Sequence, residues 1–235
     1  MHANLLSYSK PSDVGTLGDH GWAITGRSGD LNNIQDLIAY CARVSNPANQ
    51  ANSKTTPKLL NYLVKHKHWS PFEMASACME ITTTRDIARQ LLRHRSFSFQ
   101  EFSQRYADPN DMDETFVIRE SRLQDPKNRQ NSIESDDPEL NDWWHSQQVF
   151  IIDHVKRIYK EAKDRGIAKE QARAILPEGN TVSRLYVNGT IRSWIHYVEL
   201  RSANGTQKEH SDLAVEVAHA ISQIFPMLED FVEEI

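Results

Sequence analysis

The 235-residue sequence contains only two cysteines, Cys41 and Cys78. Two thiols cannot form the set of disulfides that holds small secreted domains together, and they are too few for a cysteine metal cluster. Both lie among apolar neighbours, an environment typical of buried thiols. We therefore expect neither a disulfide scaffold nor a metal site.

Long apolar runs are absent as well. No stretch approaches the ~20 residues that a helix needs to cross a bilayer, and the opening residues MHANLLSYSKPSDVG lack the hydrophobic segment of a signal peptide. Positive charge is in deficit, since 27 Lys and Arg stand against 32 Asp and Glu and give a net charge of -5. This balance argues against a general affinity for nucleic acid or anionic membranes. We expect a cytoplasmic protein that binds neither, and any basic site in it must be local.

Internal repeats and low-complexity tracts are also missing, and hydrophobic periodicity divides the chain into helices and strands. Helices are predicted at 30–46, 55–68, 85–95, 138–165 and 168–177, strands at 75–84, 114–120 and 180–189, and three helical segments at the end of the chain. Asp30 is the predicted cap of the first helix. Thr56 is the predicted cap of the second, with Pro57 at its first position.

These elements predict an α+β fold with a mixed or antiparallel sheet flanked by helices, in a single domain that spans 1–235. Residues 108–137 are polar and rich in Asp, Asn and Arg. We interpret them as a flexible excursion and a candidate lid, in preference to a boundary between domains.

The segment RHRSFSFQEFSQRY, residues 93–106, gathers three arginines, one histidine and one glutamate among aromatic residues. Successive helical residues point about 100° apart, so Arg93, His94 and Arg95 at the end of the predicted helix can contact more than one ligand. Guanidinium groups bind phosphate, carbonyl or carboxylate oxygens, and histidine donates or accepts near neutral pH. Further on, Ser103 and Arg105 alternate with their neighbours as in an extended segment, which places both on one side.

Two other interpretations of this segment stay open at this point. The cations could complement the negative end of the helix dipole on a solvated surface. Alternatively, arginines interleaved with aromatic residues could form a nucleic-acid-binding module that holds phosphates and stacks bases. The acidic net charge of the chain argues against the module.

The segment resembles the signature of the flavin-dependent thymidylate synthases, which reads Arg-His-Arg, two variable residues and Ser, followed by Glu, Ser and Arg-Tyr. The matching residues are Arg93, His94, Arg95, Ser98, Glu101, Ser103, Arg105 and Tyr106. The resemblance continues in HWSPFE (68–73), ARAILP (172–177) and NGTIRSWIHYVELR (188–201), and it extends from about residue 30 to 220. Met74 and Gln100 depart from it, because many members carry His and Asn there, and the register of 202–210 stays open.

The resemblance implies that the protein methylates dUMP to dTMP without a cysteine nucleophile. Methylenetetrahydrofolate gives the carbon, reduced FAD gives the hydride, and NADPH reduces the flavin again. Because the flavin carries the redox step, the protein has to bind, orient and polarise the reactants. The family forms homotetramers, and the resemblance implies the same assembly here.

The resemblance also implies roles for individual residues. FAD is expected to contact Ser70, Arg93, His94, Arg95, Glu101, Thr190, Arg192 and His196. The nucleotide is expected to contact Gln90, Arg93, Glu101, Ser103, Gln104, Arg105, Arg173 and Arg201. Arg201 corresponds to the arginine that holds the uracil ring and favours negative charge on it, and it is the candidate catalytic residue.

Taken alone, several of these residues have plainer interpretations. Ser70 and Glu73 have the spacing of a capping box, in which Ser70 caps a helical turn. Arg173 fits the surface of an amphipathic helix, and His196 fits a packed core histidine. The histidines of 66–68 fit cations at a helix end better than metal ligands, since no carboxylate with matching spacing accompanies them.

Helix geometry bears on the assembly. Arg192 and His196 are four residues apart and share a helix face. Arg192 and Arg201 are nine residues apart, and an unbroken helix that turns by about 100° per residue places them on opposite sides. Flavin and nucleotide must nevertheless lie in contact for hydride transfer. We therefore expect active sites that are shared between subunits of the tetramer.

Overall fold

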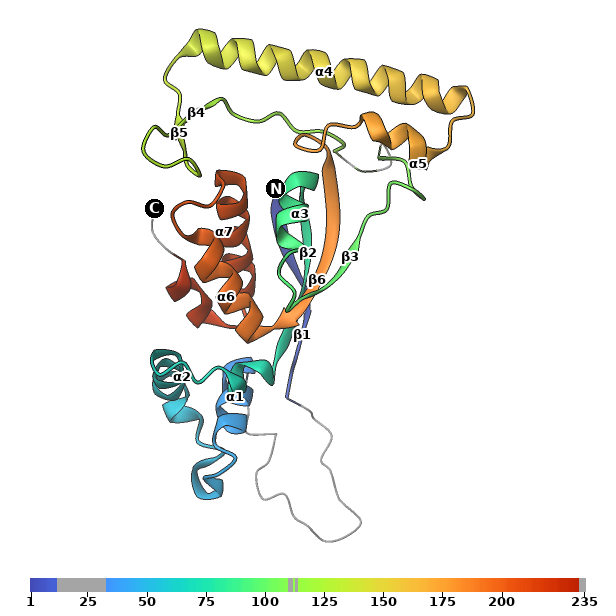
Figure 1. The fold of residues 1–235 in the computed structure, drawn as a ribbon. Coiled ribbons are helices and arrows are strands. Elements are labelled where there is room, and N and C mark those ends of the chain that lie inside the picture. Colours follow the sequence, from blue (N-terminus) through green and yellow to red (C-terminus); the bar gives the residue numbers. More distant parts are fainter. Residues whose placement is uncertain (12–32, 110–111, 113, 233–235) are drawn as a thin grey trace.

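The computed structural model describes residues 1–11, 33–109, 112 and 114–232. Its centre is a four-stranded antiparallel sheet with the strand order β1-β2-β6-β3 (Figure 1). The strands are β1 His2–Tyr8, β2 Ser76–Thr84, β6 Val182–Thr190 and β3 Ser98–Glu101. The two long strands, β2 and β6, lie in the middle and pair from Ser76 opposite Thr190 to Thr84 opposite Val182.

Strands β2 and β6 form because apolar residues alternate along them. Ala77, Met79 and Ile81 on β2 are fully buried, and so are Leu185 and Val187 on β6. The strands predicted at 75–84 and 180–189 are confirmed, with ends that differ by one or two residues. The edge strands β1 and β3 are too weakly alternating for periodicity to reveal.

The C-terminal helices pack against this sheet. They are α6 Ile191–Ser202, α7 Lys208–Ser222 and the short 3-10 helix η7 Pro226–Phe231, so the three predicted closing segments are confirmed (Figure 1). Trp194 on α6 is fully buried, and its indole N–H donates to the carbonyl oxygen of Ala77 on β2 at 3.1 Å. Leu213 and Val217 on α7 belong to the same core.

The N-terminal helical elements are α1 Ile34–Ala42, η2 Pro47–Asn49, η3 Ser53–Thr55, α2 Thr56–Lys65 and η4 Ser70–Glu73. Asn33 caps α1 by accepting from the N–H of Asp36 at 3.0 Å, and the predicted cap, Asp30, lies outside the described residues. Thr56 as the cap of α2 is wrong. It is buried inside the helix, where its hydroxyl donates to the Asp36 carboxylate at 2.7 Å, an acceptor from outside the helix.

Helix α3 Arg85–Leu91 follows β2 directly and is shorter than the helix predicted at 85–95. After Leu91 the chain turns through 92–97 and enters β3. The turn brings Phe97 inward, where its ring lies 4.4 Å from that of Trp194 between centroids. Burial of this aromatic ring outweighs the helical periodicity that the sequence suggested.

The long helix α4 Pro138–Asp164 confirms the prediction at 138–165, and Asp137 caps it by accepting from the N–H of Glu139 at 3.0 Å. It runs across one end of the molecule, apart from the sheet (Figure 1). The helix predicted at 168–177 is instead two short pieces, α5 Lys169–Ala172 and η6 Arg173–Ile175.

The polar excursion at 108–137 carries a hairpin that the sequence did not reveal, β4 Arg122–Gln124 paired with β5 Ser132–Glu134. The strand predicted at 114–120 is wrong, since Phe116 makes an isolated bridge with Thr181. Further along, the N–H of Arg119 donates to the side chain of Gln148 at 2.9 Å. This N–H is thus bonded to a side chain and not to the backbone of a neighbouring strand, as a β-sheet would require.

The architecture confirms the α+β expectation of helices around an antiparallel sheet. Within the part of the chain that the structure describes, no helix combines the length and the apolar character needed to cross a membrane.

Gly189→Ala tests the packing at the end of β6. A methyl group at Gly189 would overlap the ring of Phe97, which is buried and packs against Trp194. We expect the free energy of unfolding to fall by about 1–3 kcal/mol because the core is overpacked. Urea denaturation measures it. Gly179→Ala is the control, since nothing lies within 4 Å of a methyl group there. Equal stability of the two variants would contradict the predicted clash.

Candidate active site

The three basic residues of the signature lie in the turn that follows α3. The N–H of His94 donates to the carbonyl oxygen of Leu91 at 3.0 Å, which closes the turn. Arg93 and Arg95 are exposed, whereas His94 is half-buried. The prediction that the three fan out from a continuous helix is therefore wrong, because the helix ends at Leu91. The turn directs His94 into the protein.

His94 is in contact with the candidate catalytic arginine. The Nε of Arg201 donates to Nε2 of His94 at 3.0 Å. Burial lowers the pKa of His94 to about 4, and the positive charge of Arg201 acts in the same direction. Because a guanidinium is a donor only, Nε2 of the neutral imidazole must be the acceptor. Two signature segments more than a hundred residues apart thus meet through one directed hydrogen bond.

Two further buried rings lie behind this pair. Tyr197 is fully buried, and its ring packs edge-on against His94 with centroids 5.2 Å apart. Burial raises the pKa of Tyr197. His210 is also fully buried, 5.7 Å from Tyr197 between ring centroids, and burial followed by the charges of Arg201 and His94 lowers its pKa to about 3. The rings of His94, Tyr197 and His210 are therefore all neutral at physiological pH.

Glu101 on β3 is surrounded by donors, as the sequence suggested, although the donors are different ones. Ser183 donates to Glu101 at 2.9 Å, and the guanidinium groups of Arg85 and Arg89 lie 3.4 Å and 3.3 Å from its oxygens. Burial lowers the pKa of Arg85, while the charge of Glu101 opposes that shift. Glu101 is thus tied to α3 rather than to the Arg93–Arg95 turn.

A cavity of about 420 Å³ lies beside this cluster. It is lined by Arg85, Arg89, Gln104, Glu170, Arg173, Ala174, Leu176 and Glu178. Gln104 is buried, and its Nε2 has no hydrogen-bond partner among the described residues. Because Arg85 and Arg89 are already paired with Glu101, Arg173 and the unsatisfied amide of Gln104 are the donors that suit a ligand with phosphate oxygens.

The residues around Gln104 form a turn, in contrast to the predicted extended segment. The N–H of Tyr106 donates to the carbonyl oxygen of Ser103 at 3.1 Å. The turn buries Gln104 and leaves Arg105 exposed, 3.5 Å from the carboxylate of Glu170. The structure therefore brings Gln104 and Arg173 to one cavity, with Ser103 and Arg105 next to Gln104 in the chain.

A second group of expected site residues meets at the start of α6. Arg192 forms an ion pair with Glu73 of η4, and the ring of His196 packs edge-on against Trp69, with centroids 4.7 Å apart. Burial and then the charge of Arg192 lower the pKa of His196. Thr190 caps α6 by accepting from the N–H of Ser193 at 3.3 Å. The segments HWSPFE and NGTIRSWIHYVELR thus lie together.

Ser70, which the capping-box spacing suggested as a cap, has a different place. It is the first residue of the four-residue helix η4, whose cap position is Trp69, and Ser70 makes no capping bond. Glu73 pairs instead with Arg192, so its carboxylate is not available to complete the box.

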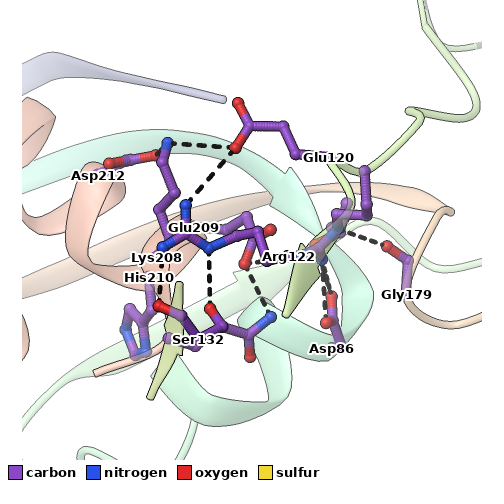
Figure 2. A network of polar contacts seen from close by, with 12 residues as sticks. Asp86, Glu120, Arg122, Ser132, Gly179, Lys208, Glu209, His210 and Asp212 are labelled. Carbon is purple, nitrogen blue, oxygen red and sulfur yellow. Dashed lines mark hydrogen bonds and ion pairs between the residues drawn. The ribbon is translucent and has the colours of Figure 1, made fainter. Parts of the chain in front are cut away.

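Arg119 holds the polar excursion against the rest of the site, and Figure 2 labels three of its partners, Asp86, Gly179 and Glu209. Its guanidinium donates to Asp86 at 2.7 Å and to the carbonyl oxygen of Gly179 at 3.0 Å, and it lies 2.8 Å from Glu209. Burial alone would raise the pKa of Glu209, but its backbone hydrogen bond and Arg119 hold that pKa below the ordinary value. Glu209 is therefore a fixed carboxylate at the start of α7.

Sequence reasoning missed Arg85, Arg89 and Arg119. Arg85 and Arg89 are four residues apart on α3, so helical spacing could have placed both on the face that meets Glu101. Arg119 lies outside any regular element, and no pattern in its neighbourhood marks it.

The remaining candidates carry less chemistry. Cys41 and Cys78 are half-buried, and burial raises the pKa of both thiols, which disfavours reactive thiolates. Phe97 packs inside the core, where it is not accessible for base stacking. In the described ranges, no three His, Cys, Asp or Glu residues gather as a metal site would require.

Known proteins share both the sequence and the fold. A family model described as thymidylate synthase complementing protein matches residues 30–227. A probable flavin-dependent thymidylate synthase of Paramecium bursaria Chlorella virus 1 is 46% identical over 228 residues, which is 97% of each chain. A flavin-dependent thymidylate synthase of Synechocystis sp. is 49% identical over 192 residues, 82% of this chain and 86% of the relative.

A solved structure gives the likeness in three dimensions. The UMP/dUMP methylase PolB from Streptomyces cacaoi, bound with 5-Br dUMP, superposes with a TM-score of 0.75. The match covers 97% of this chain and 93% of the PolB chain, and the sequences are 23% identical. The likeness shows a common fold.

The buried histidines predict a loss of stability in acid. Between the pKa of His210 in the fold, about 3, and about 6.5 in the unfolded chain, the unfolded state binds more protons, so lowering the pH favours unfolding. When the pH falls from 7 to about 4.5, the free energy of unfolding decreases in both proteins. For His210→Asn we expect this decrease to be about 2 kcal/mol smaller than for the wild type. Urea denaturation at both pH values measures this. The exposed His145→Asn should follow the wild type, and identical losses in all three proteins would contradict the prediction.

Proposed function

This chain belongs to the family of flavin-dependent thymidylate synthases, and from this premise we propose the following course for its reaction. The enzyme methylates dUMP to dTMP, taking the carbon from methylenetetrahydrofolate, and NADPH reduces the bound FAD. The observation that carries the proposal is the contact of Arg201 with His94, because it presents a fixed cation to the substrate. We place the enzyme in the cytoplasm, in keeping with its acidic composition.

The phosphate of dUMP binds in the cavity beside Glu101. Gln104 offers it an unsatisfied amide donor, and Arg173 offers a guanidinium from the same cavity. Ser103 and Arg105 flank Gln104 and complete the set. Charge-assisted hydrogen bonds from such groups are short and strong, so they fix the position of the nucleotide.

The pyrimidine lies toward Arg201, with Gln90 and Arg93 as further contacts. The guanidinium of Arg201 stabilises negative charge as it develops on the uracil ring. His94 holds the guanidinium as a neutral acceptor. A carboxylate in its place would offset the charge of Arg201, whereas the neutral imidazole orients it and leaves the charge for the substrate.

The flavin binds next to both groups. Ser70, Thr190, Arg192 and His196 hold it at the start of α6, and Arg93, His94, Arg95 and Glu101 hold it on the side of α3. Arg192 and His196 lie on one partly exposed face beside η4, which suits a dinucleotide that carries two phosphates. The bound flavin supplies the hydride, and for this reason the chain needs no reactive thiol.

The two groups of residues support active sites built by more than one subunit. Helix α6 is unbroken from Ile191 to Ser202, so Arg192 and Arg201 point to opposite sides and lie about 13 Å apart along its axis. A homotetramer in which each site combines residues of two subunits brings flavin and uracil together.

Anaerobic incubation with dUMP, methylenetetrahydrofolate, FAD and NADPH tests the activity through the formation of dTMP. We expect Arg201→Ala to keep the yellow flavin and to lose dTMP formation by at least a hundredfold, since an electrostatic contact of this kind contributes about 10²–10³ in rate. Arg95→Ala is the matched variant and should lose flavin instead. Normal turnover by Arg201→Ala would show that another group polarises the uracil.

Complementation tests the shared sites. Arg192→Ala and Arg201→Ala subunits with different tags, each inactive alone, are co-expressed, and the doubly tagged fraction is isolated. Activity should reappear there, because some sites then draw an intact arginine from each parent. Verified mixed oligomers that remain as inactive as either parent would refute active sites that combine Arg192 of one subunit with Arg201 of another.

A further inference from the structure

Gln90 on α3 is held by a chain of side chains from the start of α7. Its Nε2 lies 2.8 Å from Oε1 of Gln207, and Nε2 of Gln207 lies 2.9 Å from Glu209. On the other side, Oε1 of Gln90 lies 3.1 Å from Nδ1 of His210. Gln90 therefore has a partner for each end of its amide.

The carboxylate at the far end sets the direction of every bond in this chain. Glu209 is paired with Arg119 and can only accept, so Gln207 must turn its amide nitrogen toward it. The amide oxygen of Gln207 then faces Gln90 and accepts a hydrogen bond from the amide nitrogen of Gln90. The oxygen of Gln90 is left facing His210, whose Nδ1 must carry the ring proton.

His210 is placed to act on Gln90 and not on a ligand. It is fully buried between Tyr197 and His94, so no ligand in the solvent-exposed part of the site reaches it. Its other nitrogen, Nε2, has no hydrogen-bond partner among the described residues, and neither has the hydroxyl of the neighbouring Tyr197. Among the described residues, the imidazole of His210 has one hydrogen-bond partner, the amide of Gln90.

We propose that His210 is a positioning residue that locks the amide of Gln90, so that its remaining N–H is offered to an acceptor on the nucleotide. With Oε1 engaged by His210 and one N–H by Gln207, the second N–H is what Gln90 presents. A carbonyl or phosphate oxygen of the nucleotide can accept a hydrogen bond from this N–H, whereas an amino group cannot. The inference rests on the proposed function, which places Gln90 at the nucleotide.

A pair of substitutions separates this role from simple packing. His210→Leu removes the donor, whereas His210→Asn keeps an N–H close to the position of Nδ1. In the full-length, flavin-loaded protein, titration calorimetry with dUMP should give about fivefold to tenfold weaker binding for His210→Leu, the loss of about one hydrogen bond. His210→Asn should bind within about twofold of the wild type, and all three proteins should keep their flavin.

The Gln90→Ala background provides the second readout. If His210 acts through Gln90, adding His210→Leu to Gln90→Ala should weaken dUMP binding no further, although it weakens binding when Gln90 is present. KM for dUMP should rise in His210→Leu more than kcat falls.

Each outcome decides the matter. A wild-type protein that binds no dUMP overturns the proposed function, and the role of His210 with it. A wild type that binds dUMP while His210→Leu binds equally well overturns the role of His210 alone. Equal weakening in His210→Leu and His210→Asn, or additive losses with Gln90→Ala, also overturns it, because the donor would then not be what matters.

Discussion

The antiparallel pairing of β2 with β6 is the constraint on which the site depends. β2 leads directly into α3 and β6 directly into α6, so the two helices start at opposite ends of the paired strands. Helix α6 then runs back beside the sheet (Figure 1). Its last turn carries Arg201 to His94, beyond the end of α3. A slip of one residue in this pairing would turn the apolar side chains of β6 away from the core and would separate Arg201 from His94.

The arginines of the site differ in how their charge is balanced. Arg85 and Arg89 share Glu101, and Arg192 pairs with Glu73. Arg201 contacts His94, which burial keeps neutral. The first three cations are held by carboxylates, which offset part of their charge. Among the described residues Arg201 has no carboxylate partner, so its charge stays available at a fixed place, which is what stabilisation of a developing anion requires.

The start of α7 connects the polar excursion to Gln90 on α3. Arg119 contacts Asp86 on α3, Glu209 on α7 and the carbonyl oxygen of Gly179. Removal of Arg119 would leave two carboxylates without their partner, a costly change in a poorly solvated place. Because Glu209 also anchors the hydrogen bonds that reach Gln90, the excursion is linked to Gln90 through a continuous chain of contacts.

Local sequence determined the elements with strong periodicity and the family to which the chain belongs. The alternation in β2 and β6 and the long amphipathic helix α4 were predictable, because each pattern reports a buried face directly. The signature around His94 and Glu101 indicated the family and a flavin site.

What sequence could not give was the partner of each side chain. The end of α3 depends on where Phe97 finds Trp194, and the neutrality of His94 and His210 depends on burial by distant helices. The arrangement of Arg119 and Gln90 follows from contacts between segments far apart in the chain, which only tertiary packing decides, because hydrogen bonds and burial depend on distance in space and not along the sequence.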